Sequence, residues 1–136
     1  MKKLKILIVS DPYGKPSFAP RLRYLCNYLV AQGHQIAVYT EQFQEHDFPH
    51  AYPIIEKEMA YHTTWQWAWQ SLWSLLTDWR NRCFTKWLQQ QVADQAFDIV
   101  FCTTFSTFPL RAAEAIARSK QIPLVVDIRD LDEQIP

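Results

Sequence analysis

The sequence predicts one α/β domain built on a doubly wound, Rossmann-like parallel sheet. Short, continuous apolar runs recur along the chain, and this pattern is typical of strands that are covered on both faces. Segments with apolar residues at three- and four-residue spacing lie between these runs, as expected for amphipathic helices. The alternation favours parallel strands joined by right-handed crossovers. At 136 residues, the chain is long enough for a single hydrophobic core.

The first part of the chain predicts a strand, a helix and a second strand. Lys5–Val9 is a continuous aliphatic run that ends at a Ser-Asp-Pro sequence. Ala19–Gln32 has helical spacing, tolerates a proline in its first turn and is followed by a glycine that stops the helix. Gln35–Thr40 predicts the second strand. Residues 41–62 contain two prolines and three histidines and predict at most a short strand near Tyr52–Glu56.

The second part repeats the alternation after a long helical region. Thr63–Val92 predicts one long helix, or two helices with a break near Trp79–Cys83. Asp98–Cys102 is another short apolar strand, and Phe105–Ser119 has a helical face of alanine, leucine and isoleucine. An Ile-Pro pair then resets the chain into the last strand, Leu124–Asp127.

The composition excludes several classes of function. Fourteen basic and fourteen acidic residues balance, so no overall charge attracts nucleic acid. The three cysteines form no CxxC pair and the four histidines no metal-binding spacing, so we expect no disulfide framework and no metal site. No stretch approaches the ~20 apolar residues of a membrane span. We therefore expect a cytoplasmic protein, in solution or at the inner face of the membrane.

The predicted sheet indicates where a ligand would bind. In open parallel sheets, ligands bind beyond the carboxyl ends of the strands, where the direction of the crossovers reverses. The chain has only two glycines, which excludes both the dinucleotide fingerprint and the P-loop. The segments expected at that edge are Ser10–Phe18, Thr40–Gln42, Thr103–Thr107 and Asp127–Glu133.

Two long stretches carry a resemblance to a known family. The opening KILIVSDPYGKPSFAPRLRYLCNYLVAQGHQIAVYT and the later FDIVFCTTFSTFPLRAAEAIARSKQIPLVVDIRDL resemble the N-terminal part of family-4 glycosyltransferases of the GT-B type. The shared features are a proline- and glycine-containing loop after the first strand, an arginine-bearing helix ending in Gly-His, and a terminal Asp-x-Arg-Asp. The resemblance leaves out about residues 41–92. The family commonly has Trp-Pro-Glu where this chain has Asp132-Glu133-Gln134, so the contacts of that tripeptide are not carried over.

The resemblance implies a function for the chain. Residues 1–136 would be an acceptor-side domain, truncated before a C-terminal domain that holds most of the nucleotide-sugar donor. The enzyme would transfer a sugar to a polysaccharide or lipid-linked acceptor without a metal ion or other cofactor, and this chain alone would be inactive. The alternative is a non-catalytic, flavodoxin-like scaffold module that docks a partner or a membrane through its tryptophan-rich helix.

Candidate site residues follow from the resemblance and from their places after the strands. Arg129 would offer a cationic fork to phosphate or a sugar hydroxyl, and Asp130 would accept the proton of the acceptor hydroxyl. Alternatively, Arg129 pairs with Asp127 or Asp130 as a structural clamp. Arg21 would bind a phosphate, or belong to a solvated helix face. The candidates for acceptor binding are Ser10, Asp11, Tyr13, Gly14, Lys15, Arg21, Thr103, Thr104 and Asp127.

The tryptophan-rich region 63–92 leaves two interpretations open. An apolar stripe at helical spacing usually packs inside a protein, so a core helix is the leading interpretation. An interfacial helix is the alternative, with tryptophan at headgroup depth and basic residues on anionic lipid. The membrane-facing candidates are then Trp67, Arg80, Arg82 and Lys86.

Overall fold

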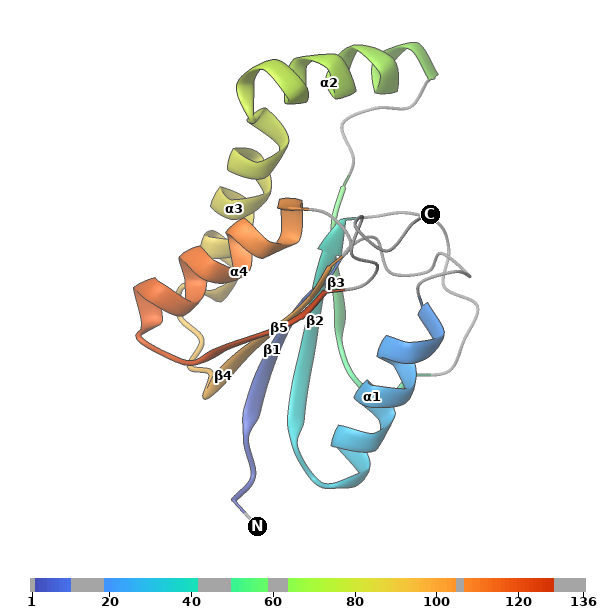
Figure 1. Ribbon diagram of the computed structural model, residues 1–136. Helices are drawn as coiled ribbons and strands as arrows, with labels where there is room; N and C mark the ends of the chain where they lie inside the picture. The colour runs from blue at the N-terminus through green and yellow to red at the C-terminus, as the bar shows by residue number, and fades with distance from the viewer. Residues whose placement is uncertain (1, 11–18, 42–49, 59–63, 105–106, 129–136) are drawn as a thin grey trace.

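A computed structural model describes residues 2–10, 19–41, 50–58, 64–104 and 107–128. Its five strands form one parallel sheet in the order β3-β2-β1-β4-β5, which confirms the predicted doubly wound α/β class. Figure 1 shows α1 on one side of this sheet and α3 and α4 on the other. The elements are β1 (Lys5–Ser10), α1 (Ala19–Ala31), β2 (Gln35–Glu41), β3 (Ile54–Lys57), α2 (Thr64–Thr77), α3 (Trp79–Val92), β4 (Ile99–Thr104), α4 (Thr107–Lys120) and β5 (Leu124–Ile128).

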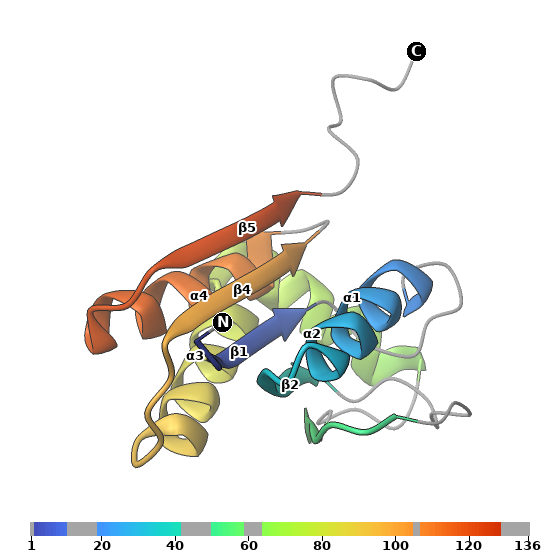
Figure 2. The same ribbon diagram turned by 90° about the horizontal axis from the view of Figure 1, so that it is seen from below.

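The central strands are apolar on both faces because each face packs against helices. Alternate residues of β1 point into different clusters, so Leu7 meets α3 and α4 whereas Ile8 meets α1. Phe84 and Leu88 of α3 are fully buried in the first cluster. Figure 2 shows β3 and β5 at opposite edges of the sheet, and Val125 of β5 is partly exposed there.

The turn between α1 and β2 has the predicted glycine stop. Gly33 adopts a positive φ of 83°, a conformation that glycine enters without a side-chain clash. Its amide donates to the Val30 carbonyl at 2.8 Å, and the His34 amide donates to the Leu29 carbonyl at 3.1 Å. His34 lies in the turn, where its Nδ1 accepts a hydrogen bond from the Leu4 amide at 3.1 Å.

The long helical region is two helices that meet at Asp78, one residue before the range predicted for the break. Asp78 has a left-handed φ of 55°, which interrupts the helix and turns the chain. Its carboxylate accepts hydrogen bonds from Asn81 Nδ2 and Arg111 Nη1, so α3 and α4 both hold the junction. We call residues 77–81 the elbow.

The prediction that the tryptophan stripe lies in the core is wrong for α2. Because the elbow turns the chain, the two helices present different faces to the sheet. In α3, Phe84, Leu88 and Val92 are buried, with Trp87 packed against them. In α2, 76% of the surface of Trp65 is exposed. No described part of the chain covers the face of α2 on which it lies.

Candidate functional site

The site predicted by the topology lies between β1 and β4. From β1 the chain steps to β2 and β3, and it then returns through α2 and α3 to β4 on the other side of β1. The crossovers therefore reverse between these two neighbouring strands, which is where doubly wound sheets bind ligands. Ser10 and Thr103 are paired in register at this point, and each lies at or next to the last residue of its strand.

The floor of this edge is made of small, buried polar residues. Ser10 is fully buried, and Thr103 and Thr104 are nearly so. Thr40 Oγ1 donates a hydrogen bond to the Ser10 carbonyl at 3.2 Å, which ties the ends of β1 and β2 together. Buried polar groups need such partners, and this bond supplies one where β1 ends.

A cluster of three side chains extends across the reversal point; we call it the Asp127 cluster. Asp127 Oδ1 accepts from Arg21 Nη2 at 2.9 Å, and Asp127 Oδ2 accepts from Thr103 Oγ1 at 3.2 Å. The three residues come from the first turn of α1, the end of β5 and the end of β4. Since α1 packs on β1 and β2, the arginine reaches across β1 and β4 to β5.

The ion pair between Arg21 and Asp127 is weak enough for a bound ligand to replace it. The Arg21 side chain is 72% exposed and the Asp127 side chain 23% exposed. An ion pair this accessible to water is worth little, typically below about 1 kcal/mol. An incoming anion could thus compete for the guanidinium, close to the helix N-terminus of α1, whose amide dipoles also favour negative charge.

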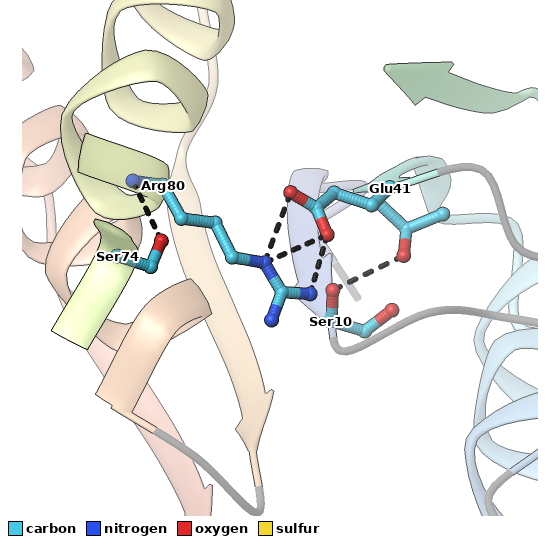
Figure 3. A network of polar contacts seen from close by, with 5 residues as sticks. Ser10, Glu41, Ser74 and Arg80 are labelled. Carbon is cyan, nitrogen blue, oxygen red and sulfur yellow. Dashed lines mark hydrogen bonds and ion pairs between the residues drawn. The ribbon is translucent and has the colours of Figure 1, made fainter. Parts of the chain in front are cut away.

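A second ion pair at this edge joins two residues that sequence reasoning did not connect, namely Glu41 and Arg80, of which it placed Arg80 among the membrane-facing candidates. Figure 3 shows Arg80 directed from the start of α3 toward Glu41 at the end of β2. Arg80 Nε lies 3.1 Å from Glu41 Oε2, and Nη2 of the same guanidinium also donates to that oxygen. The Glu41 side chain is only 5% exposed. The available signal was an acidic residue ending an apolar strand; its partner lies 39 positions away.

The structure brings some predicted site residues together and leaves others apart. Ser10, Thr103, Thr104 and Asp127 share the carboxyl edge, and Arg21 joins them through Asp127. Arg82 and Lys86 are exposed on α3. Among the residues that the structure describes, no three His, Cys, Asp or Glu side chains gather as a metal-binding set. Six candidates lie outside the described residues, namely Asp11, Tyr13, Gly14, Lys15, Arg129 and Asp130, as does the side chain of Trp67.

No helix within the described segments combines the length and the apolar character required to cross a membrane. The large aromatic side chains that remain exposed in these segments are Tyr24 and Tyr28 on α1 and Trp65, Trp69 and Trp73 on α2.

Comparison with solved structures finds the same fold at low sequence identity. The C-terminal domain of a hydrogenase from Pyrococcus furiosus matches with a TM-score of 0.57 and 11% identity, over 94% of each chain. A second structure of that domain gives a TM-score of 0.63 at 10% identity, over 93% of each chain. The calicheamicin glycosyltransferase CalG4 matches with a TM-score of 0.61 and 17% identity, over 93% of this chain and 32% of CalG4.

Comparison with curated protein sequences gives no match. The model of the glycosyl transferase 4-like domain, in contrast, matches residues 18–136, which includes α1, the whole sheet after β1 and the Asp127 cluster. A match over most of the chain, together with the doubly wound sheet, establishes the relationship that the sequence motifs suggested. The chain belongs to the family of glycosyl transferase 4-like domains.

Proposed function

We propose that this chain is the acceptor-side, N-terminal half of a GT-B glycosyltransferase. It would work with a C-terminal domain that holds most of a nucleotide-sugar donor, and transfer the sugar to a polysaccharide or lipid-linked acceptor. The observation that carries the proposal is the Asp127 cluster, because it crosses the reversal point of a sheet that belongs to a glycosyltransferase family. We also propose that this chain does not catalyse sugar transfer without the C-terminal domain.

The proposed chemistry uses the residues around the end of β5. The acceptor hydroxyl oxygen attacks the anomeric carbon of the donor, the bond from that carbon to the diphosphate breaks, and the hydroxyl proton passes to Asp130. Arg129 meets the charge that develops on the diphosphate, as does the second domain. In the sequence both residues follow Ile128, the last residue of β5, whose carboxyl end lies at this edge of the sheet.

The acceptor would be held by the polar edge itself. Ser10, Thr103 and Thr104 are buried and would form the polar floor beneath it, and Tyr13, which follows β1 in the sequence, would stack on a sugar ring. Arg21 would leave Asp127 to bind an acceptor phosphate, and Asp127 would then be available to a sugar hydroxyl. We further propose that the enzyme works in the cytoplasm, at the inner face of the membrane, where lipid-linked acceptors are found.

The direct test is sugar transfer by the full-length protein, measured with a panel of nucleotide sugars and with isolated glycan and lipid-linked acceptors. We expect Asp130→Ala and Arg129→Ala to reduce kcat by at least about a hundredfold, as the loss of a general base or a charge-stabilising group does. Arg118→Ala on α4 is the matched control, because Arg118 pairs with Glu114 on the surface, and it should leave the rate unchanged.

Two results would contradict the proposal. Unchanged rates in both variants would remove the segment after β5 from the reaction. Absence of transfer with every donor, combined with binding of a protein or lipid partner, would favour the scaffold module instead.

A further inference from the structure

The most unusual surface of the molecule is the apolar face of α2. This face consists of Trp65, Ala68, Trp69, Leu72, Trp73, Leu75 and Leu76. At 100° per residue these positions fall on one side of the helix, and Gln66, Ser74 and Thr77 fall on the other. The six large side chains of the face are between 50% and 85% exposed. Together they expose several hundred Å², which is more than scattered surface residues do.

The position of α2 places this face near one edge of the sheet. Figure 1 shows α2 lying beyond the carboxyl ends of the strands and running across them, attached to the rest of the chain through α3. The elbow is held from several sides: Asp78 binds Arg111 and Asn81, Arg80 binds Glu41, and the Arg80 amide donates to Ser74 Oγ at 3.3 Å. The helix is therefore anchored to the same edge of the sheet that carries the Asp127 cluster.

The composition of α2 favours a lipid surface as the occupant. Three of the six tryptophans of the chain lie on this one face, and none of the 14 residues of the helix is charged. Tryptophan is the side chain that concentrates at the boundary between lipid and water. At 1.5 Å per residue the helix is about 21 Å long, short of the ~30 Å hydrocarbon core, so it suits lying in the interface and not spanning it.

The charges next to α2 complement anionic headgroups. Between residues 64 and 92 the sequence has three basic residues and one acidic residue, Asp78, and the carboxylate of Asp78 is engaged by Arg111. Arg82 is exposed and its Nη2 donates to the Thr77 carbonyl, which places a cation at the C-terminal end of α2. Lys86 is exposed one turn further along α3. Basic residues at this position attract acidic lipids.

We infer that the apolar face of α2 inserts into the surface of an anionic membrane, with Arg82 and Lys86 contacting the headgroups. This inference rests on the membrane association proposed above and assigns it to one helix. Because α2 lies beyond the carboxyl ends of the strands, insertion would bring that edge of the sheet, and with it the Asp127 cluster, near the lipid surface.

The test is flotation of the chain with vesicles of phosphatidylcholine and phosphatidylglycerol. Trp69→Ser combined with Trp73→Ser should lower the partition coefficient at least about tenfold, because each exposed tryptophan loses its transfer into the interface. The matched control is Tyr24→Ser combined with Tyr28→Ser, which removes two exposed aromatic side chains from α1 on the other side of the sheet. This control should float like wild type. Far-UV circular dichroism of all variants verifies that they are folded.

Two further arms test the charges and the depth. Lys86→Glu should weaken binding to anionic vesicles about fivefold or more, whereas Lys3→Glu, next to the Gly33 turn at the opposite end of the sheet, should not. Lipids brominated near the headgroup end of the acyl chain should quench the tryptophan fluorescence of the wild type.

Four results would overturn the inference. The first three are no flotation of the wild type, equal flotation of the tryptophan and tyrosine variants, and binding to neutral vesicles that equals binding to anionic ones. The fourth is a wild-type dimer that binds no lipid and that the tryptophan substitutions dissociate. Failure of the vesicle experiment can be distinguished from failure of the proposed enzymatic function. Sugar transfer to a soluble acceptor that persists without flotation would sink this inference alone, and flotation without transfer would sink the proposed reaction alone.

Discussion

The Glu41–Arg80 pair supports a quantitative prediction about what holds the elbow to the sheet. Arg80→Ala leaves the Glu41 carboxylate, 5% exposed, without its cationic partner. Removal of one partner from a buried pair costs about 3 to 5 kcal/mol, mainly through the buried charge that remains. The Arg80 side chain is 44% exposed, so water can reach the vacated position and part of the cost is relieved. We therefore expect a loss of about 2 to 3 kcal/mol in the free energy of unfolding.

Urea unfolding followed by circular dichroism measures this loss. For a domain of this size, it corresponds to a fall in Tm of roughly 6 to 12 °C. Glu41→Gln removes the buried charge itself, so the double variant Arg80→Ala with Glu41→Gln should be less destabilised than the sum of the single variants. Arg118→Ala is the control with the same pair of residue types, and its exposed i,i+4 contact with Glu114 should contribute only about 0.3 to 0.5 kcal/mol.

Equal effects of Arg80→Ala and Arg118→Ala would refute the reasoning, because burial would then make no difference. Additive single and double variants would also refute it, since they would show that Glu41 and Arg80 are not coupled.

Three further predictions test the core, the α1 turn and the Asp127 cluster. Leu88→Ala removes a fully buried side chain of α3 and should lower the free energy of unfolding in urea by about 2 to 5 kcal/mol. Leu76→Ala, on the exposed face of α2, should change it by less than about 0.5 kcal/mol. Similar values for the two variants would contradict the assigned burial. Gly33→Ala should cost about 1 kcal/mol or more because alanine is strained at a φ of 83°, and an unchanged midpoint would show that the turn adapts. Asp127→Asn should lower the free energy of unfolding by less than about 1 kcal/mol, because its partner Arg21 is exposed. The same substitution should reduce the rate of sugar transfer by the full-length enzyme, and an unchanged rate would remove Asp127 from the site.

Much of the fold could be predicted from local patterns. The continuous apolar run of β1 required a strand with both faces covered, and Leu7 and Ile8 lie in the two different core clusters. The glycine stop of α1 followed from a backbone preference that acts within a few residues. Strand ends were predicted less well, because β4 continues to Thr104 and β5 to Ile128 through pairing between strands.

The fate of the tryptophan stripe could not be predicted in the same way. Helical spacing shows that a face is apolar, but it does not show what covers that face. The break at Asp78 decided the outcome, since it let α3 bury Phe84 and Leu88 and left Trp65 and Trp69 of α2 in solvent.

The sequence by itself therefore determined the α/β class and the order of the elements, because these depend on periodicity and on stop signals between near neighbours. The edge of the sheet at which a ligand is expected followed from that order. Only the tertiary structure decided which charges meet. Arg21 and Asp127 are 106 positions apart, and Glu41 and Arg80 are 39 apart. No local pattern selects one such partner among fourteen basic and fourteen acidic residues; the packing of the sheet brings the two members of each pair within hydrogen-bonding distance.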